Sequence, residues 1–498
     1  MDWLLSLGTF GKILYTVILI IEVLLVFNLM ILVHEWGHFL AARWRGLYVD
    51  RFQIWFGKPL WKKTVNGVQY GLGCIPAGGF VSLPQMAPME AIEGSVDSKD
   101  PLPPIKPLDK IIVAFAGPLF SFGLAALFAF FVSWLGKPET ESLNTTTIGY
   151  VLEDSAAAKG GLKVGDKILE IDDQPIKRFE GFVDSVRWAV IASEGDKIVF
   201  KVDRPGQGIV ECALSAADAR VAPEKSSWLG SIFKRPPLKE IGIIGKQTPM
   251  VGKIMENGPA AEAGLKPGDQ VLSLNGKPVY HFAEIGEAAK TGDGKPLQLT
   301  IRRGKTEEMI SVTPRLPDKR PEDITKPMIG LEWHAVGERK LAHPGVGEQL
   351  SAASRSMVNM IGSLFSAKSD ISPAHMSGPV GIGRVYYNLL QDPDALLMVL
   401  WFSVVLNVNL AIMNMLPFPV LDGGHITMAI AEWIRRKPLQ GRILEAFQTA
   451  CALMLFGFLI FVTLKDAGDL FLGGGKKDKA GAAKPGEEIQ WLPKAERP

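Results

Sequence analysis

The hydrophobic residues of this chain are concentrated in four long apolar blocks separated by polar sequence. The blocks cover residues 13–33, 111–135, 395–416 and 444–464. A helix of about 20 apolar residues crosses the roughly 30 Å hydrocarbon layer of a membrane, so each block predicts one transmembrane helix. Residues 1–12 lack a basic region and no Ala-x-Ala site follows the first block. We therefore expect that block to stay in the protein and not to be removed as a signal peptide.

The polar sequence after the first block has the pattern of short β-strands. Residues 49–56 and 68–75 read as two strands, and Asn66-Gly67 between them is a hairpin turn signal. We expect a β-hairpin over residues 47–83, followed by an exposed loop over residues 84–110. The free edge of the hairpin could accept a peptide strand, although a purely structural hairpin is the simpler interpretation.

An internal repeat lies between the second and third blocks. Residues 148–176 align without a gap with residues 251–279, and the positions that coincide are Gly149/Gly252, Ala157/Ala260, Ala158/Ala261, Gly161/Gly264, Leu162/Leu265, Gly165/Gly268, Asp166/Asp269 and Pro175/Pro278. Each copy reads as strand, short helix, Gly-Leu-Lys-x-Gly-Asp, strand and turn, which indicates a duplicated module. That order resembles a PDZ domain of the bacterial protease type.

PDZ domains bind peptides as an added strand, so peptide ligands are possible partners of this pair. The candidate peptide-binding loop is Ile-Gly-Ile-Ile-Gly at residues 241–245. A pair of domains that acts as a filter or spacer and binds little peptide is an equal alternative.

The clearest chemical motif closes the first apolar block. His34 and His38 are four residues apart, so on a helix they share one face and can bind one metal ion. Glu35 lies beside this pair but off it, where a carboxylate can take a proton from a metal-bound water. A helix end whose polar side chains simply face water is the alternative. Ionisable residues at the end of a membrane-length apolar run favour the functional interpretation.

The third block ends in a second polar motif. Asn407, Asn409 and Asn414 interrupt the apolar sequence, and the prolines of Pro-Phe-Pro at residues 417–419 end the helix. Asp422 follows, at the same end of its span as the two histidines if the sequence between blocks two and three lies on the other side. A pair of histidines lacks a third zinc ligand, and Asp422 is the best-placed oxygen donor.

Composition and charge narrow the function further. Hydrophobic residues make up 47% of the chain, charged residues 21%, and the formal net charge of +2 gives no reason to expect a nucleic-acid partner. The three cysteines match neither a disulfide framework nor a cysteine-rich zinc site. Basic residues follow the first block at positions 43, 45, 51, 58, 62 and 63, against Lys12 alone before it. The positive-inside rule then places the histidine motif near the cytoplasm and the PDZ modules on the outer, periplasmic side.

The predicted fold class is a polytopic α-helical membrane protein with a membrane-associated β-hairpin and two α+β PDZ domains. In chain order we expect a first transmembrane helix (1–46), the hairpin (47–83), a loop (84–110), a second transmembrane helix (111–136), two PDZ domains (145–216 and 240–316), a connector with amphipathic segments (317–392), a third transmembrane helix with the Leu-Asp-Gly motif (393–432), a fourth transmembrane helix (443–465) and a disordered tail (473–498).

Together these motifs resemble the site-2 intramembrane zinc metalloproteases of the bacterial regulator-of-sigma-E type. The resemblance implies a Zn²⁺ ion held by His34, His38 and Asp422, with Glu35 as general base. It implies that Asn409 and Asn414 contact the unwound substrate and that the hairpin is a membrane-reentrant β loop. Two positions depart from the usual family pattern: Ser121 stands where asparagine is usual, and Trp-Phe-Gly at residues 55–57 stands where Gly-Phe-Gly is usual. We expect neither departure to touch the metal site.

The function implied by this resemblance is cleavage of transmembrane segments of single-span membrane proteins, such as anti-sigma factors that an earlier protease has trimmed. This is regulated intramembrane proteolysis in the bacterial inner membrane, in a stress response. The alternative is a catalytically silent membrane scaffold whose PDZ pair binds exported proteins. Intact Glu35 and Asp422 argue against the scaffold, which needs neither residue. A zinc protease domain on a simple membrane anchor is excluded because the metal ligands lie in the spans.

Overall fold

The structure is a computed structural model that describes residues 8–86, 105–221, 233–321, 324–334, 337, 339–366, 368–436, 441–471 and 489–493, with the backbone alone at residues 77, 441–445 and 471. These residues fall into two compact units. The helical unit comprises Met1–Lys137, His343–Val358 and Met376–Ala467, and the β-rich unit comprises Pro138–Ala342, Asn359–His375 and Gly468–Pro498. The predicted loop over residues 84–110 lies largely outside the described residues.

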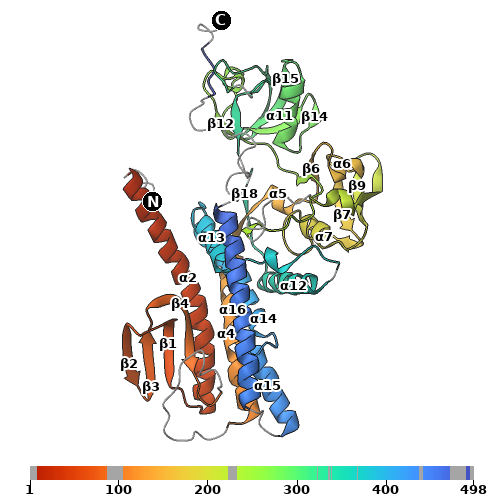
Figure 1. The fold of residues 1–498 in the computed structure, drawn as a ribbon. Helices are drawn as coiled ribbons and strands as arrows, with labels where there is room; N and C mark the ends of the chain where they lie inside the picture. The colour runs from red at the N-terminus through yellow and green to blue at the C-terminus, as the bar shows by residue number, and fades with distance from the viewer. Residues whose placement is uncertain are drawn as a thin grey trace. The chain divides into compact units, whose positions relative to one another are not determined.

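Four helices of the described chain are long and apolar enough to cross a membrane: α2 (Gly8–Arg45), α4 (Pro107–Leu135), α14 (Ala395–Asn414) and the Ala446–Leu470 part of α16 (Gly441–Phe471). This confirms the predicted fold class of a helical membrane protein with β-rich domains. Helix α4 packs against both α2 and α14 (Figure 1). Small residues permit the approach of α2 to α4, because a Cβ on Gly37 would stand 2.5 Å from the Ala116 carbonyl oxygen.

The third predicted helix is two helices. Helix α14 ends at Asn414, and α15 (Asp422–Arg435) begins after the Pro-Phe-Pro segment. Proline lacks a backbone N–H and fixes φ, so the chain cannot continue as one helix through this point. The shorter α13 (Pro379–Leu390) packs on α2 and α14.

The predicted hairpin is a four-stranded sheet, which corrects the expectation from sequence. Its strands are β1 (Arg51–Phe56), β2 (Trp61–Val65), β3 (Val68–Leu72) and β4 (Ile75–Ser82), in the order β2-β3-β1-β4. The Asn66-Gly67 turn joins β2 to β3, while β1 runs parallel to β3 and antiparallel to β4. We missed β2 because all five of its residues are exposed, so it shows no alternation of buried and exposed positions.

The β-rich unit contains two modules with the same element order. The first is built from β6 (Ile148–Val151), α6 (Ala156–Lys159), β7 (Lys167–Ile171), β8 (Gln174–Pro175), α7 (Val186–Ala192), β9 (Lys197–Arg204) and β10 (Gly208–Ser215). The second repeats this order with β12 (Val251–Ile254), α10 (Pro259–Glu262), β13 (Gln270–Leu274), β14 (Lys277–Pro278), α11 (Phe282–Thr291), β15 (Leu297–Arg303) and β16 (Thr306–Val312). Each module has its own buried apolar core.

A buried ion pair explains the repeated Gly-Asp motif of the two modules. Asp166 is fully buried and accepts hydrogen bonds from Arg204 Nε at 2.8 Å and Nη2 at 2.7 Å. Asp269 accepts the same two bonds from Arg303, at 2.8 and 2.7 Å. Such bidentate pairing stabilises a carboxylate away from water. The duplication seen in the sequence therefore extends to the packing of the cores.

The strand that completes each module lies outside the predicted domain boundaries. Strand β11 (Ile243–Gly245) pairs with β6, and β17 (Leu331–Trp333) pairs with β12. The candidate loop at residues 241–245 thus belongs to the first module, although the boundary at residue 240 had assigned it to the second. Each closing strand is distant in sequence from its partner, so local pattern did not reveal the pairing.

The remaining described elements are β5 (Lys137–Thr140), α5 (Glu141–Asn144), α8 (Ala216–Ala219), β18 (Arg339–Ala342), α12 (Val346–Phe365) and the 3₁₀ turn η1 (Pro373–His375). Most of the tail predicted to be disordered lies outside the described residues. Residues 489–493 correct that expectation, because Trp491 is 4% exposed and Gln490 pairs with Lys319.

Candidate metal centre

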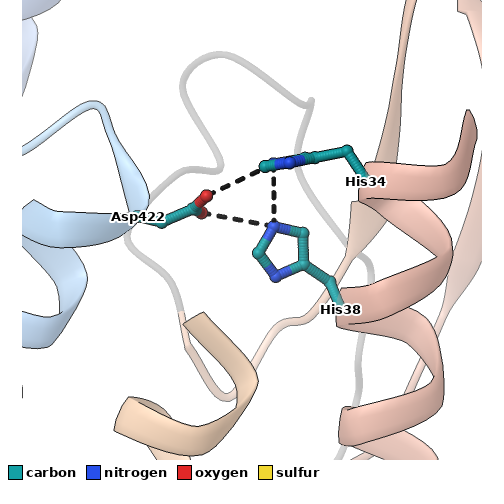
Figure 2. Close-up of side chains that lie close together, drawn as sticks. All are labelled: His34, His38 and Asp422. Atoms are coloured by element: carbon teal, nitrogen blue, oxygen red, sulfur yellow. Dashed lines mark hydrogen bonds and ion pairs between the residues drawn. The ribbon is translucent and has the colours of Figure 1, made fainter. Parts of the chain in front are cut away.

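The three predicted metal ligands meet in the helical unit. His34 and His38 lie one turn apart on α2, and their Nε2 atoms are 3.2 Å from each other. Asp422, the first residue of α15, places Oδ2 3.3 Å from His34 Nε2 and Oδ1 3.3 Å from His38 Nε2 (Figure 2). The two histidines are 7% and 9% exposed. The chain thus brings together one carboxylate and two imidazoles from segments almost 400 residues apart.

The outer nitrogen of each imidazole is held by α4. His38 Nδ1 is 2.8 Å from the Val113 carbonyl oxygen, which can only accept, so Nδ1 carries the proton and Nε2 presents its lone pair to the cluster. His34 Nδ1 is 3.0 Å from the Ser121 hydroxyl, and Ser121 is fully buried. Hydrogen bonds of this kind fix the orientation of metal-binding histidines.

The position of Ser121 corrects a prediction. We expected the departure from the family pattern at this residue not to touch the metal site, yet its hydroxyl contacts His34 directly. A sequence signal existed, because Ser121 lies one helical turn after Gly117 and so shares the face of α4 that meets α2.

The Ala-Gly-Pro motif of α4 makes room for His38. A Cβ built on Gly117 would stand 2.2 Å from His38 Nε2, closer than real Cβ atoms approach any heavy atom. Only glycine therefore fits beside this ring.

Asp422 is held by a tight turn between α14 and α15. Cβ atoms on Gly423 and Gly424 would meet the carbonyl oxygens of Met415 and Phe418 at 2.2 and 2.1 Å, so the Asp-Gly-Gly sequence is required for this chain path. The carboxylate also sits at the N-terminus of α15, where the helix dipole favours negative charge.

The cluster has the dimensions of a tetrahedral zinc site. Zinc bonds of roughly 2.0–2.1 Å at tetrahedral angles place neighbouring ligand atoms about 3.3–3.4 Å apart. Here the two Nε2 atoms are 3.2 Å apart, and each lies 3.3 Å from one of the two carboxylate oxygens of Asp422. Two imidazole lone pairs and a carboxylate converging in a buried space need a cation between them, and two histidines with one carboxylate are a ligand set typical of catalytic zinc. The residues therefore fit the metal.

The other predicted site residues lie around this cluster. Glu35 is outside the ligand set and lies close to the backbone of Val81 in β4. Asn414 Nδ2 is 3.3 Å from His34 Nε2. Asn409 has a buried Oδ1 with no hydrogen-bond partner among the described residues. His425 is near in sequence but does not join the three-residue cluster in the described chain.

Trp55, the second departure from the family pattern, does not join the ligand cluster. It interrupts the β1–β4 register with φ of 68°, a conformation that favours glycine. Its indole N–H donates to Asn28 Oδ1 at 2.6 Å, which ties the sheet to α2.

Comparison with known sequences shows which protein family the chain belongs to. The profile of peptidase family M50 matches residues 22–458. The chain belongs to peptidase family M50. As a member of that family it is a multi-pass membrane zinc metalloprotease, and the His34, His38 and Asp422 cluster fits its metal site.

Individual relatives in this family match over most of their length. A Neisseria meningitidis protein provisionally named as a zinc metalloprotease is 30% identical, over 84% of this chain and 92% of that protein. The regulator of sigma E protease of Haemophilus influenzae is 28% identical, over 94% of this chain and 99% of the relative. Protease RseP of Yersinia pestis is 29% identical, over 84% and 91%.

Proposed function

We propose that this M50 peptidase hydrolyses peptide bonds within or beside the transmembrane segments of single-span membrane proteins. The observation that carries the proposal is the place of the ligands: two lie in α2, one of the four apolar spans, and the third follows the break at the end of α14. A substrate bond must enter the spans to reach them. The Haemophilus influenzae relative is named a regulator of sigma E protease, which supports anti-sigma factors as the substrate class, in regulated intramembrane proteolysis.

The side chains around the cluster divide the chemistry between them. Bound zinc supplies a polarised water of pKa near 7 and an electrophile for the developing oxyanion. Glu35, beside the ligands but outside the set, accepts the proton of that water.

Substrate unwinding requires partners for freed backbone groups. A helical substrate hides its peptide groups in i to i−4 hydrogen bonds, so these bonds must break before cleavage. The unpartnered Oδ1 of Asn409 can accept a substrate N–H. Asn414 Nδ2 lies 3.3 Å from His34 Nε2, so its amide would be available to substrate if that nitrogen held zinc. An edge of the four-stranded sheet can add the unwound segment as a strand.

The test combines metal content with cleavage of a single-span substrate in detergent. Wild type should bind one zinc and cleave within the span. Glu35→Gln should keep zinc and lose turnover, whereas Asp422→Asn should lower zinc occupancy as His34→Ala does. Wild-type zinc content without any cleavage of a trimmed span would favour the silent scaffold. Full zinc occupancy in Asp422→Asn would remove that residue from the ligand set.

We also propose the orientation that the basic residues after the first block predict, with the zinc near the cytoplasm and the PDZ-like modules periplasmic. A reporter fused after Lys63 should then be cytoplasmic, and reporters at Gly206 or Arg302 exported. An exported reporter at Lys63 would invert the topology.

In that orientation the modules and the zinc lie towards opposite sides of the membrane, so a peptide bound to the modules is not at the metal. The modules can therefore only select which substrates reach the site. We favour a filter that excludes substrates with bulky outer domains. Deleting residues 145–333 should leave cleavage of a short-tailed substrate intact and admit a long-tailed one. Slower cleavage of the short-tailed substrate would instead indicate recruitment of peptides by the modules.

A further inference from the structure

The C-terminal segment binds the second PDZ-like module. The Lys319 N–H donates to the Gln490 carbonyl at 3.1 Å, and the Gln490 N–H donates back to the Lys319 carbonyl at 3.0 Å. The Leu492 N–H donates to the Asp318 carboxylate at 2.7 Å. Trp491 between them is buried. Three consecutive residues thus engage the module as an extended peptide would, through backbone pairing and one anchoring side chain.

The surface that receives this segment is fixed by contacts within the module. Arg315 Nη1 holds the Asp318 carboxylate at 3.1 Å, and Arg315 Nη2 donates to the Asn257 carbonyl at 2.6 Å. The acceptor for the Leu492 N–H is therefore positioned by groups that do not belong to the tail. Such preorganisation lowers the cost of binding a peptide.

The anchoring tryptophan sits beside the closing strand of the module. The tip of the Trp491 ring is 3.3 Å from where a Cβ of Gly330 would stand, and Gly330 has φ of 74° immediately before β17. At the equivalent Gly242 of the first module, the three nearest atoms belong to Ser155 and Leu152. The contact therefore distinguishes the second module from the first.

The membrane topology permits this contact. Two candidate spans, α14 and α16, lie between the second module and the tail. Two crossings return the chain to the side from which it started, so module and tail share one side whichever orientation the protein adopts. Both also belong to the same compact unit.

We propose that residues 489–493 are an intramolecular peptide ligand of the second module. The tail-binding surface, formed by Asp318, Lys319 and Gly330, then recognises an extended peptide with a central tryptophan. The Trp491 indole N–H is buried with no acceptor among the described residues, and an unpaired donor weakens the contact. The tail is therefore a ligand that another peptide can displace.

The test measures binding of a fluorescent peptide with the sequence of residues 487–494, by anisotropy, to the Glu35→Gln chain, so that its outcome is independent of cleavage. The peptide should bind the chain truncated after Phe471 and bind the full chain at least 10-fold more weakly, because the tether gives the tail a local concentration of order mM. Trp491→Ala in the full chain should restore binding to the truncated level. A peptide with phenylalanine at the Trp491 position, which keeps a ring and lacks the unpaired N–H, should bind severalfold tighter.

The specificity of the surface is tested with Asp318→Asn, which should weaken peptide binding about tenfold. Equal peptide affinity for truncated and full chains would overturn the proposal. So would absence of peptide binding to both the truncated and Trp491→Ala chains, which would make the tail a fixed part of the module's fold.

Discussion

Replacing Gly117 with alanine should remove zinc from the protein. The added methyl group would stand 2.2 Å from His38 Nε2 and 2.5 Å from Cε1, whereas real Cβ atoms essentially never lie under 3.0 Å from another heavy atom. The ring or the helix must move until that contact opens. The required shift is several times the roughly 0.2 Å tolerance of a zinc–ligand bond. His38 would then no longer reach the position that completes the site.

The expected loss of zinc affinity can be estimated from the effect of displacing one metal ligand. Changes that only disturb the hydrogen bond behind a ligand lower metal affinity by about 10–100-fold. Gly117→Ala moves the ligand atom itself, so we expect a loss of at least about 100-fold, or roughly 2.7 kcal/mol. The hydrogen bond from His38 Nδ1 to Val113 resists rotation of the ring and makes a compensating movement more costly.

A matched control lies in the same helix. Gly123→Ala makes the same chemical change in α4, but nothing lies within 4 Å of its Cβ. Both variants gain about 1 kcal/mol of helix propensity, so any difference between them reports on the metal site. Bound zinc is measured after dialysis against graded chelator. Gly123→Ala should match wild type. A Gly117→Ala protein that retains zinc with wild-type affinity would refute the placement of His38 against α4.

Three further outcomes are expected. Ser121→Ala should weaken zinc affinity by about 10–100-fold through loss of the contact to His34, as measured by competition with a chelator. Ser121→Asn, which supplies another polar side chain, should keep the wild-type zinc affinity. Trp55→Phe, which keeps an aromatic ring but loses the hydrogen bond to Asn28, should raise KM while leaving zinc content unchanged; unchanged kinetics would show that this bond does not position the sheet. Burial lowers the pKa of His281 from 6.5 to about 4, so the unfolded chain binds more protons between these values, and the second module should lose stability as pH falls from about 6.5 towards 4. His281→Asn, which keeps an acceptor at the N-cap of α11, should remove that pH dependence of hydrogen exchange in the helix.

The sequence by itself determined those features that depend on residues close together in the chain. Apolar blocks of membrane length predict helices because only a helix satisfies its own backbone in lipid. His34 and His38 are four residues apart, about one helical turn, so their spacing places them on one face of α2. Asp422 could be predicted as the third ligand because successive spans cross the membrane in alternate directions. The C-terminal ends of the first and third spans therefore lie on the same side, where His34 and His38 also lie.

Tertiary structure alone decided the pairings between distant segments. A strand pattern does not say which strand is its neighbour, so the parallel pairing of β1 with β3 and the closure of each module by β11 and β17 were missed. Contacts between helix faces are equally nonlocal, and Ser121 reached the metal site through the packing of α4 on α2. The burial of Trp491 on the second module depends on a surface formed by residues more than 160 positions earlier in the chain. Such contacts arise from chain folding in three dimensions, which local hydrophobic periodicity does not encode.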